Sequence, residues 1–586
     1  MASALGDPLL LTVHQHGTLY RRLHRLVEWF KDPDPRFVLH SSQRPKIFRY
    51  AKFNIDALCC LASGLRGGIS CHCDSSQAPF SGSLNWAISI IFLDGVEWLL
   101  RSPLNENGVI PCPRTNSMLL ESEAVTLKYL RSNSFIPVPE VFAYSCSKEN
   151  DIGIPYILMS KAPGSPLQPR WTHMSSDDKA KILRQLGSIT WQLCQLKFDQ
   201  IGSLFEGPRG PVIKTCLARG LLVCERHTLP LNRGPFTSTI DFYKALISAF
   251  QEHASLLPLN AHCFLAPFPL PEEFEDSNQF ERARDRWHDF VAIDSKIDGF
   301  DNRTDYMIVS DLLADMREKW VRDTSLKEDS CYFSLHHPDI SVNNIFIDEE
   351  YNITCLIDWA FCSSVPLSLA ITEPGLPQSR HELPEVFREE FRRGFSEAAY
   401  STSNRADPAE NTLLCRSLQL SRPMWLISRL LSFDTVVDYP VLNDLWVITN
   451  PNKGHLLEEF KIRQSQDTYM GVHALLKEDD DHSRAAEEKH FKKGTQVDLT
   501  VARKLTLVSQ WSSRYGQHGI VGLRVASSAF KTGEALWKWI DRSRAIRKEP
   551  IVIQVKSRIC GTNAFEKLER PLGTKLDNRA LEASKP

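Results

Sequence analysis

The stretch from Ser334 to Trp359 constrains the fold more than any other part of this 586-residue chain. It begins with the polar loop His337-Pro338-Asp339, continues into the apolar run 345–347 and returns through the apolar run 353–357 after a polar turn. Two short apolar runs that flank a polar turn are typical of an antiparallel hairpin. The sequence therefore predicts a hairpin that follows directly on a polar loop.

Pairing about the turn at 348–352 would bring two oxygen-bearing side chains together. Position 351 lies midway between Asn344 and Asp358, so antiparallel pairing places them nearly opposite each other, within a register error of one or two residues. Directly opposed Cβ atoms lie about 5 Å apart. Because Mg²⁺ takes a few carboxylate or amide oxygens and keeps water and phosphate in its other positions, Asn344 and Asp358 are candidate Mg²⁺ ligands.

Asp339 lies on the loop before this hairpin, where it could accept a proton from an attacking hydroxyl or orient it. Phosphoryl transfer depends mainly on positioning and charge neutralisation, so one base and a bound metal are sufficient. We expect His337 to brace the loop through hydrogen bonds rather than to act as the base. Asp339 and His337 are therefore the candidate catalytic residues. The alternative, that Asp339 is only a turn residue, is disfavoured by its place after Pro338 on a loop flanked by strands.

An antiparallel sheet is expected in the first third of the chain. Asp94-Gly95 separates the β-prone runs 85–92 and 96–101, which is a strong hairpin signal. A helix is predicted over 121–131, and two further strands over 141–144 and 156–160. Beyond Ala162-Pro163-Gly164 the pattern becomes helical, beginning with a helix that Ser175 caps. The sequence thus predicts an α+β fold.

Composition excludes several partners. Lys and Arg total 69 against 71 Asp and Glu, a net charge of -2, so neither nucleic acid nor an anionic membrane is an expected partner. No apolar run approaches the ~20 residues that span a bilayer. Fifteen cysteines without a regular framework suggest reduced thiols in the cytoplasm. A mitochondrial location is the alternative, because 19–30 could form an amphipathic helix with three arginines, although Asp7 and Glu28 argue against an acid-poor transit peptide.

The cysteine-rich segment at 59–73 could also suggest zinc. It holds Cys59, Cys60, Cys71, His72 and Cys73, which are ligand types that zinc prefers. It lacks paired C-x2-C knuckles, so we expect free thiols there rather than a zinc site.

The sequence resembles the aminoglycoside phosphotransferase and choline kinase-like family, in particular its fungal members. His337-Pro338-Asp339 with Asn344 matches the family's H-x-D-x-x-x-x-N loop, and Ile357-Asp358-Trp359 matches its metal-binding strand end. Further likeness lies in 94–101, 136–141 and 156–164. The resemblance covers about 80–470 and implies a two-lobed protein-kinase-like fold, with a small antiparallel-sheet N-lobe and a large, mainly helical C-lobe that carries a helical insertion.

The resemblance also implies site residues and a domain division. Gly82 and Ser83 would lie over the phosphates, Arg101 would contact them and pair with Glu123, and Ser160 to Ala162 would meet adenine. We expect the chain to divide into an N-terminal extension that is partly helical (1–78), an N-lobe (79–162), a C-lobe (163–470) with an insertion (203–330) and the catalytic loop (334–360), C-terminal helices (471–545) and a disordered tail (546–586).

Two functions follow from these observations. The first is an ATP- and Mg²⁺-dependent kinase that phosphorylates a small hydroxylated acceptor lying against the insertion and Trp359. The second is a pseudokinase-like scaffold, favoured by the single Gly82 in the loop, by Arg101 in place of lysine and by Ala360 after the aromatic residue. A protein kinase is disfavoured because no D-F-G and A-P-E pair is present. Two simpler roles stay open: Arg101 and Glu123 as a surface ion pair, and Trp359 as core packing. The acceptor and the oligomeric state are not predicted.

Overall fold

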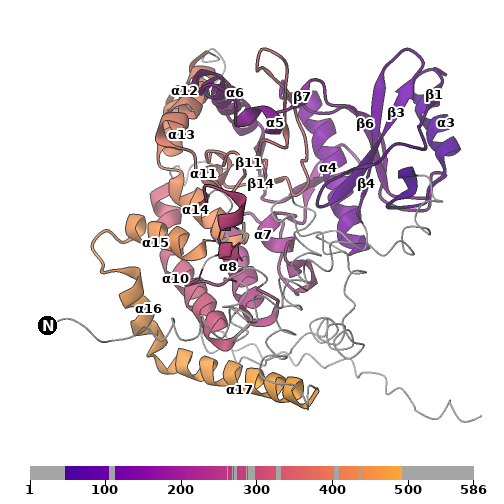
Figure 1. Ribbon diagram of the computed structural model, residues 1–586. Coiled ribbons are helices and arrows are strands. Elements are labelled where there is room, and N and C mark those ends of the chain that lie inside the picture. Colours follow the sequence, from indigo (N-terminus) through magenta and orange to yellow (C-terminus); the bar gives the residue numbers. More distant parts are fainter. Residues whose placement is uncertain are drawn as a thin grey trace, which may run out of the picture. The chain divides into compact units, whose positions relative to one another are not determined.

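An antiparallel sheet followed by a mainly helical part makes up the computed structural model (Figure 1). This order confirms the predicted α+β class. The structure describes residues 46–104, 112–259, 262–266, 268–269, 273–280, 282–284, 287, 297–324, 332–401, 408–434 and 437–490. The helices expected at 19–30 and 499–539 and the tail expected at 546–586 lie outside the described residues.

The sheet contains six strands within the described residues, in the order β1-β3-β4-β6-β5, with β2 paired to β3. All neighbouring pairs are antiparallel. The predicted hairpin about Asp94-Gly95 is present, and Gly95 has a φ of +82°, which glycine adopts without strain. The strands are β1 (Cys71–His72), β2 (Phe80–Ser81), β3 (Asn85–Phe92), β4 (Glu97–Pro103), β5 (Val141–Ser145) and β6 (Tyr156–Ser160).

Strands β3 and β4 alternate between buried and partly exposed residues, so each presents one face to an apolar core. The 3-10 turn η1 (Lys46–Phe48) and helix α3 (Ile55–Leu65) contribute to the core on that face. Helix α4 (Pro113–Asn133) contributes to a second core cluster through Leu120, Ala124 and Leu127. The predicted helix at 121–131 thus begins earlier, at Pro113, whose fixed φ suits the first turn of a helix.

The rest of the described chain is mainly helical, with short strands between the helices. The helices are α5 (Gln168–Trp171), α6 (Ser176–Cys194), α7 (Arg219–Leu222), η2 (Arg226–Thr228), α8 (Thr239–Leu256), α10 (Phe300–Thr324), α11 (Leu367–Ala370), α12 (Glu385–Ser401), α13 (Pro408–Gln419), α14 (Arg422–Leu431), α15 (Asp438–Thr449), α16 (Leu456–Gln464) and α17 (Asp467–His490). The strands are β7 (Ser165–Pro166), β8 (Lys197–Phe198), β9 (Ser203–Phe205), β10 (Val212–Lys214), β11 (Phe333–His336), β12 (Ile345–Ile347), β13 (Ile353–Leu356) and β14 (Ser363–Val365).

Helices α6 and α12 pack with their backbones in close contact, because each supplies a glycine at the crossing. A Cβ atom on Gly187 would lie 2.1 Å from the carbonyl oxygen of Phe391, and one on Gly394 would lie 2.0 Å from that of Arg184. Such distances are far below van der Waals contact. As predicted, α6 begins after Ser175, whose hydroxyl accepts a hydrogen bond from the Asp178 amide.

The predicted catalytic hairpin is formed by β12 and β13. Ile345 pairs with Leu356, and an irregularity between Phe346 and Ile347 shifts the pairing toward the turn. The amide of Ile357 consequently donates to the carbonyl of Asn344 across 3.0 Å. Asn344 therefore faces Ile357, one position from Asp358 and within the predicted register error.

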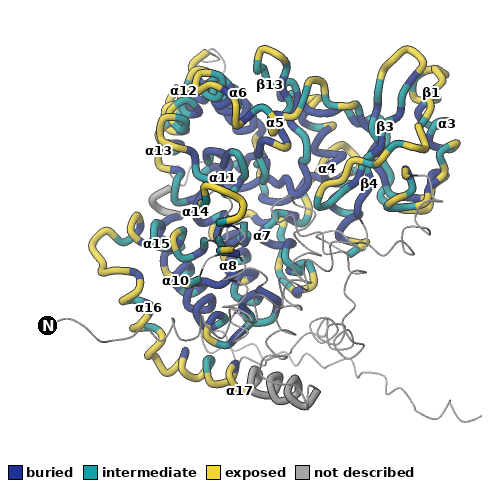
Figure 2. Tube along the Cα trace, viewed as in Figure 1, coloured by how far each residue is buried: buried dark blue, intermediate teal, exposed yellow. Residues whose placement is uncertain are grey.

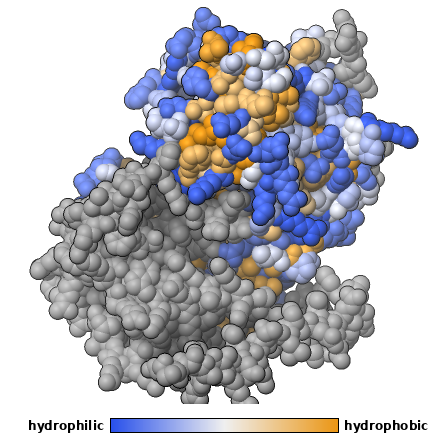
Figure 3. Space-filling model, turned by 90° about the vertical axis from the view of Figure 1, so that its right-hand side faces the viewer, coloured by the Kyte–Doolittle hydropathy of each residue, from blue (hydrophilic) through white to orange (hydrophobic). Residues whose placement is uncertain are grey.

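Burial follows this architecture: buried residues concentrate in the sheet and in the inner helices, whereas α16 and much of α17 are exposed (Figure 2). The face that carries the sheet shows an apolar area bordered by hydrophilic side chains (Figure 3). Exposed apolar residues of this part of the chain include Leu65, Ile69, Phe80, Leu93 and Val96. Within the described residues, the helices lack the combination of length and apolar character that crossing a lipid bilayer requires.

Candidate active site

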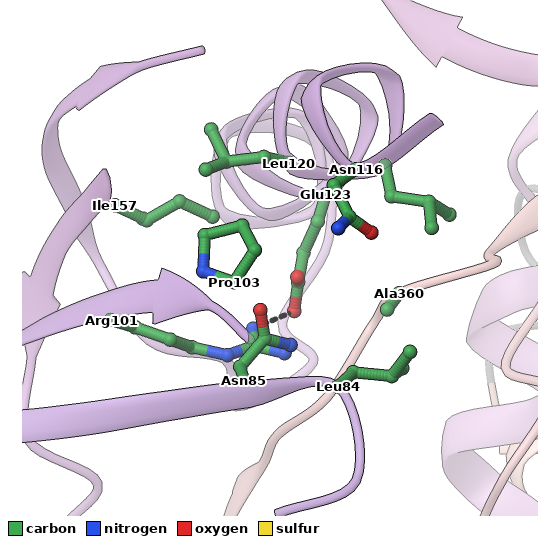
Figure 4. A pocket seen from close by; sticks show the side chains of 10 residues that line it. Leu84, Asn85, Arg101, Pro103, Asn116, Leu120, Glu123, Ile157 and Ala360 are labelled. Carbon is green, nitrogen blue, oxygen red and sulfur yellow. Dashed lines mark hydrogen bonds and ion pairs between the residues drawn. The ribbon is translucent and has the colours of Figure 1, made fainter. Parts of the chain in front are cut away.

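Arg101 joins the sheet, helix α4 and the catalytic segment in one ion-pair network. Its Nη1 donates to Glu123 Oε1, and its Nη2 donates to Asp358 Oδ1 across 2.7 Å. Figure 4 shows the guanidinium reaching from strand β4 to Glu123 on the helix. The predicted Arg101–Glu123 pair is present, and it is not a surface pair, because the exposed fractions of the two side chains are only 15% and 4%.

The strand pattern explains why Arg101 points this way. Trp98 and Leu100 on β4 face the apolar core, so Arg101, one residue further along, faces the opposite side of the sheet. The cavity on that side has about 350 Å³ of empty space and is also lined by Asn85, Ile157 and Ala360. Residues from β3, β4, β6, α4 and the segment after the hairpin thus meet there.

The charged side chains of this network stabilise one another electrostatically. Burial alone would lower the pKa of Arg101, but the carboxylates of Glu123 and Asp358 reverse this effect and raise it. Arg101 therefore stays protonated. Glu123 Oε1 also accepts the backbone N–H of Trp359 across 3.1 Å, so this buried carboxylate fixes the start of the segment after Asp358. Asp358 itself has a φ of +63°, an uncommon conformation for a non-glycine residue.

Both ring nitrogens of His337 form hydrogen bonds with backbone groups of the catalytic segment. Its Nδ1 accepts the backbone N–H of Asp339 at 3.2 Å, so Nε2 carries the proton and donates to the Ile357 carbonyl at 3.0 Å. Burial lowers the pKa of His337, which keeps the imidazole neutral. The ring also contacts Trp359 edge-on, with 4.6 Å between centroids. This geometry agrees with the bracing role expected for His337.

Asn344 is tied to the candidate base. Its Nδ2 donates to the Asp339 carbonyl at 2.9 Å and lies 3.4 Å from Asp339 Oδ2. Because the side-chain nitrogen of Asn344 makes these contacts, its side-chain oxygen is the atom that could bind a cation. Among the described residues no group of three His, Cys, Asp or Glu side chains is arranged for a metal ion. A Mg²⁺ site with two protein oxygens does not need such a group, because water and phosphates complete its coordination. Asn344 and Asp358 offer oxygen donors of the kind that Mg²⁺ takes, and their role as its ligands stays a prediction.

The residues predicted to meet the nucleotide lie in two places, at the turn before β3 and at the end of β6. Gly82 and Ser83 form the turn between β2 and β3, next to Leu84 and Asn85, which line the cavity. Ser160 ends β6, and its hydroxyl accepts the Glu140 amide at 2.9 Å, so this side chain serves the sheet. Ala162 follows two residues later. Their contacts with a nucleotide stay a prediction.

Trp359 has a different environment from the acceptor wall that we expected. Its exposed fraction is 1%, it belongs to the core, and its Nε1 donates to the Leu356 carbonyl at 3.0 Å. The sequence leaves Trp359 a place either in the acceptor site or in the core, and its burial shows that it packs in the core. Phe361, two residues further on, lines a second cavity beside Pro338 instead. The charged residues of that cavity come from distant segments without a local motif, so the sequence alone does not indicate them.

The cysteine segment forms a small thiol cluster. Cys59 on α3 receives hydrogen bonds from Cys73 and Cys71, and the first of these has the largest effect in lowering the pKa of Cys59 to about 6. Cys60 and His72 are exposed, whereas Cys59, Cys71 and Cys73 are partly buried. That the segment holds free thiols rather than zinc stays a prediction.

Comparison with known proteins agrees with the sequence resemblance. The model of the phosphotransferase enzyme family matches residues 94–368, which contain Arg101, Glu123, Asp339, Asn344 and Asp358. A subtelomeric hrmA-associated cluster protein of Aspergillus fumigatus is 38% identical over 135 residues, or 23% of this chain and 25% of that protein. The chain thus spans about a quarter of that relative's length.

A second relative and two solved structures are also similar. The Kluyveromyces lactis protein named altered inheritance of mitochondria protein 9, mitochondrial, is 23% identical over 291 residues, which is 43% of this chain and 42% of that protein. A fructosamine-3-kinase described as putative, from Thermobifida fusca, covers 67% of this chain and 96% of its own at 13% identity, with a TM-score of 0.34. Plasmodium vivax ethanolamine kinase covers 72% and 87% at 11% identity, with a TM-score of 0.32.

Proposed function

We propose that the chain transfers the γ-phosphate of ATP to a hydroxyl group of a small molecule, because the model of the phosphotransferase enzyme family matches residues 94–368. The observation that supports this most is the link between the two candidate catalytic segments. Asn344 bonds to Asp339, while Asp358 bonds through Arg101 to Glu123. These are two sets of side-chain bonds, and backbone contacts hold them side by side: the Ile357 amide donates to the Asn344 carbonyl, and the Ile357 carbonyl accepts from His337.

In this proposal each side chain has a separate task. Asp339 accepts the proton of the attacking hydroxyl, or orients it, and the amide of Asn344 holds Asp339 in place. His337 keeps the loop rigid and stays neutral. Arg101 contacts phosphate oxygens while Glu123 holds its guanidinium in position, and a guanidinium can contact two oxygens at once.

Asn344 and Asp358 would hold Mg²⁺, which neutralises charge on the phosphates when it is bound. Nucleotide would lie beside Gly82, Ser83 and Arg101, with its base toward Ser160 and Ala162. We expect the acceptor on the other side of Asp339, next to the segment 203–330 expected as an insertion. The yeast relatives are named as mitochondrial proteins, so we propose mitochondria as the alternative to a cytoplasmic location.

A nucleotide-binding scaffold without turnover is the second candidate, and one contact favours it. Arg101 already occupies an oxygen of Asp358, the carboxylate that Mg²⁺ would need. If this ion pair persisted with nucleotide bound, the metal would lose a ligand. The two candidates therefore differ in whether nucleotide binding becomes Mg²⁺-dependent.

The experiment that separates them measures ATP binding and ADP release with and without Mg²⁺, over a panel of hydroxylated metabolites. The kinase proposal predicts ADP release that needs Mg²⁺ and that falls in Asp358→Asn. Glu349→Gln is the matched control, because this carboxylate lies in the exposed hairpin turn and forms its ion pair, within the described residues, with Arg170. ATP binding without Mg²⁺-dependent ADP release, unchanged in Asp358→Asn, would support the scaffold instead.

A further inference from the structure

A second cavity lies directly behind the candidate catalytic loop. It has about 600 Å³ of empty space, including its open mouth. It is lined by His336 and Pro338, by Phe361 and Val365, and by residues of helices α7, α8, α11 and α14 and the segment that follows α14. Because Pro338 precedes Asp339, a molecule in this cavity would lie next to the candidate base.

Positive charge exceeds negative charge at the inner end of this cavity. Arg219 on α7 and Arg429 on α14 both pair with a single carboxylate, Asp434, at 3.7 Å for Arg219 and at closer range for Arg429. Asp434 also accepts a hydrogen bond from the Ser379 hydroxyl at 2.9 Å. Arg380 adds a third positive charge nearby, which together with the first two helps to lower the pKa of Asp434 against the effect of burial.

The other titratable group on the cavity wall does not offset this excess. Burial, together with repulsion from Arg429, lowers the pKa of His336 to about 3, so this imidazole is neutral. Asp434 is shared by its arginines, so at least one positive charge lacks a carboxylate of its own at this end. In addition, the Nε–H groups of Arg219 and Arg429 are buried without a hydrogen-bond acceptor among the described residues. Buried donors of this kind are costly unless an acceptor is supplied.

Arg219 also interacts electrostatically with carboxylates of the candidate active site. Burial would lower the pKa of Arg219, but Asp434, then Asp339 and more weakly Asp358, raise it. The guanidinium therefore interacts electrostatically with the candidate base Asp339 and with the candidate metal ligand Asp358. The ring of Phe361 lies 5.8 Å from Arg219 and forms an apolar wall beside it. Arg219 and Arg429 thus give the cavity an anion-attracting part, and Asp339 directly follows the lining residue Pro338 in the chain.

We propose that this cavity is the acceptor site and that it selects a hydroxylated small molecule carrying an anionic group, a carboxylate or a phosphate, which Arg219 and Arg429 bind. That the bound molecule is the phosphate acceptor rests on the proposed function. That the cavity binds an anionic small molecule does not. An anion here would balance the excess charge through charge-assisted contacts with the two guanidinium groups. A cationic acceptor would face Arg219 and Arg429 directly and would be repelled.

The test measures binding to the full chain, without turnover, by calorimetry and thermal shift. The probes are two matched sets: glycerol, glycerate and glycerol 3-phosphate, and glucose, gluconate and glucose 6-phosphate. Each set holds the polyol framework nearly constant and adds a carboxylate or a phosphate. Measurements with and without a non-hydrolysable ATP analogue and Mg²⁺ separate this cavity from any phosphate site at the nucleotide.

We expect the anionic members of at least one set to bind about tenfold tighter than the neutral member, which is the effect of one charge-assisted contact. Arg219→Gln should remove the difference, and Arg219→Lys should restore part of it. Arg209→Gln is the matched control, because Arg209 is exposed and does not line the cavity. Comparison of the carboxylate and phosphate members identifies which anion is preferred.

Two results would overturn the proposal. In the first, the neutral and anionic members of both sets bind equally, or none of them binds. In the second, the tighter binding of the anionic members persists in Arg219→Gln. Either result leaves the proposed function intact if Mg²⁺-dependent ADP release is observed. Conversely, anion binding that depends on Arg219 in a chain without ADP release would support the site and refute the kinase.

Discussion

Arg101 and Asp358 lie 257 residues apart in the sequence and are joined by a hydrogen bond of 2.7 Å. The same guanidinium binds Glu123, whose side chain is only 4% exposed. The network therefore connects the sheet, helix α4 and the segment after the catalytic hairpin. A charge buried in this way is stable only while its partner is present.

Arg101→Met should destabilise the fold, because it leaves the Glu123 carboxylate unpaired in the interior. Removing one partner of a buried pair costs about 3–5 kcal/mol, and we expect an effect near that range in urea unfolding. The double variant Arg101→Met with Glu123→Gln should recover part of the loss. A loss below about 1 kcal/mol in the single variant, as for exposed pairs, would contradict the buried network.

Gly394→Ala should separate helices α6 and α12. Its new Cβ atom would lie 2.0 Å from the carbonyl oxygen of Arg184, so the helices must move apart. Overpacking of this kind costs about 1–3 kcal/mol or more. The matched control is Gly471→Ala in α17, where nothing lies within 4 Å of the new atom. The control should stabilise the chain by up to about 1 kcal/mol, because alanine favours helix. Equal melting temperatures for the two variants would refute the close crossing.

The fold was largely predictable, because its signals are local. The Asp94-Gly95 turn and the alternating runs on either side specify a hairpin, and Ser175 with its following apolar spacing specifies α6. The start of α4 was missed because Thr115 and Asn116 are the buried residues of its first turns, which hides the apolar period. The register of the catalytic hairpin differed by one position because the turn pairs Asp348 with Asn352, so it is centred on position 350 rather than 351, and the irregularity between Phe346 and Ile347 offsets only part of this difference.

The candidate site was predictable only where it follows a motif. Asp339, Asn344 and Asp358 belong to one segment, and Arg101 and Glu123 were placed by resemblance. Arg219 and Arg429 come from helices α7 and α14, which are adjacent only in the folded chain. Trp359 and Phe361 are both aromatic, and only packing determines which of them enters the core.

Asp305 should make stability depend on pH. Burial raises its pKa from 3.8 to about 7, although Gln464 donates a hydrogen bond to it at 2.9 Å. Between these two values the unfolded chain releases the proton while the folded chain keeps it, so stability falls as the pH rises. Wild type should lose up to about 1.4 kcal/mol per pH unit in that window relative to Asp305→Asn. Urea unfolding from pH 4 to 8 measures this difference, and parallel curves for the two proteins would refute it.

Cys59 should react fastest among the described thiols near neutral pH. The thiol of Cys73 donates a hydrogen bond that lowers the pKa of Cys59 to about 6, so the reactive thiolate predominates at pH 7. Mass spectrometry after brief iodoacetamide treatment should find Cys59 modified first. Cys73→Ala should slow this reaction, whereas Cys60→Ala, which removes an exposed neighbour, should not. Preferential labelling of Cys60 would contradict the cluster.

The measurement that tests the central claim most directly compares Asp339→Asn with wild type in two assays, Mg²⁺-ATP binding and ADP release over the acceptor panel. Asn keeps the size of the side chain but cannot accept the hydroxyl proton. The account predicts nearly unchanged nucleotide affinity and a fall in turnover of roughly 10²- to 10⁴-fold. Turnover at the wild-type rate in Asp339→Asn would contradict it.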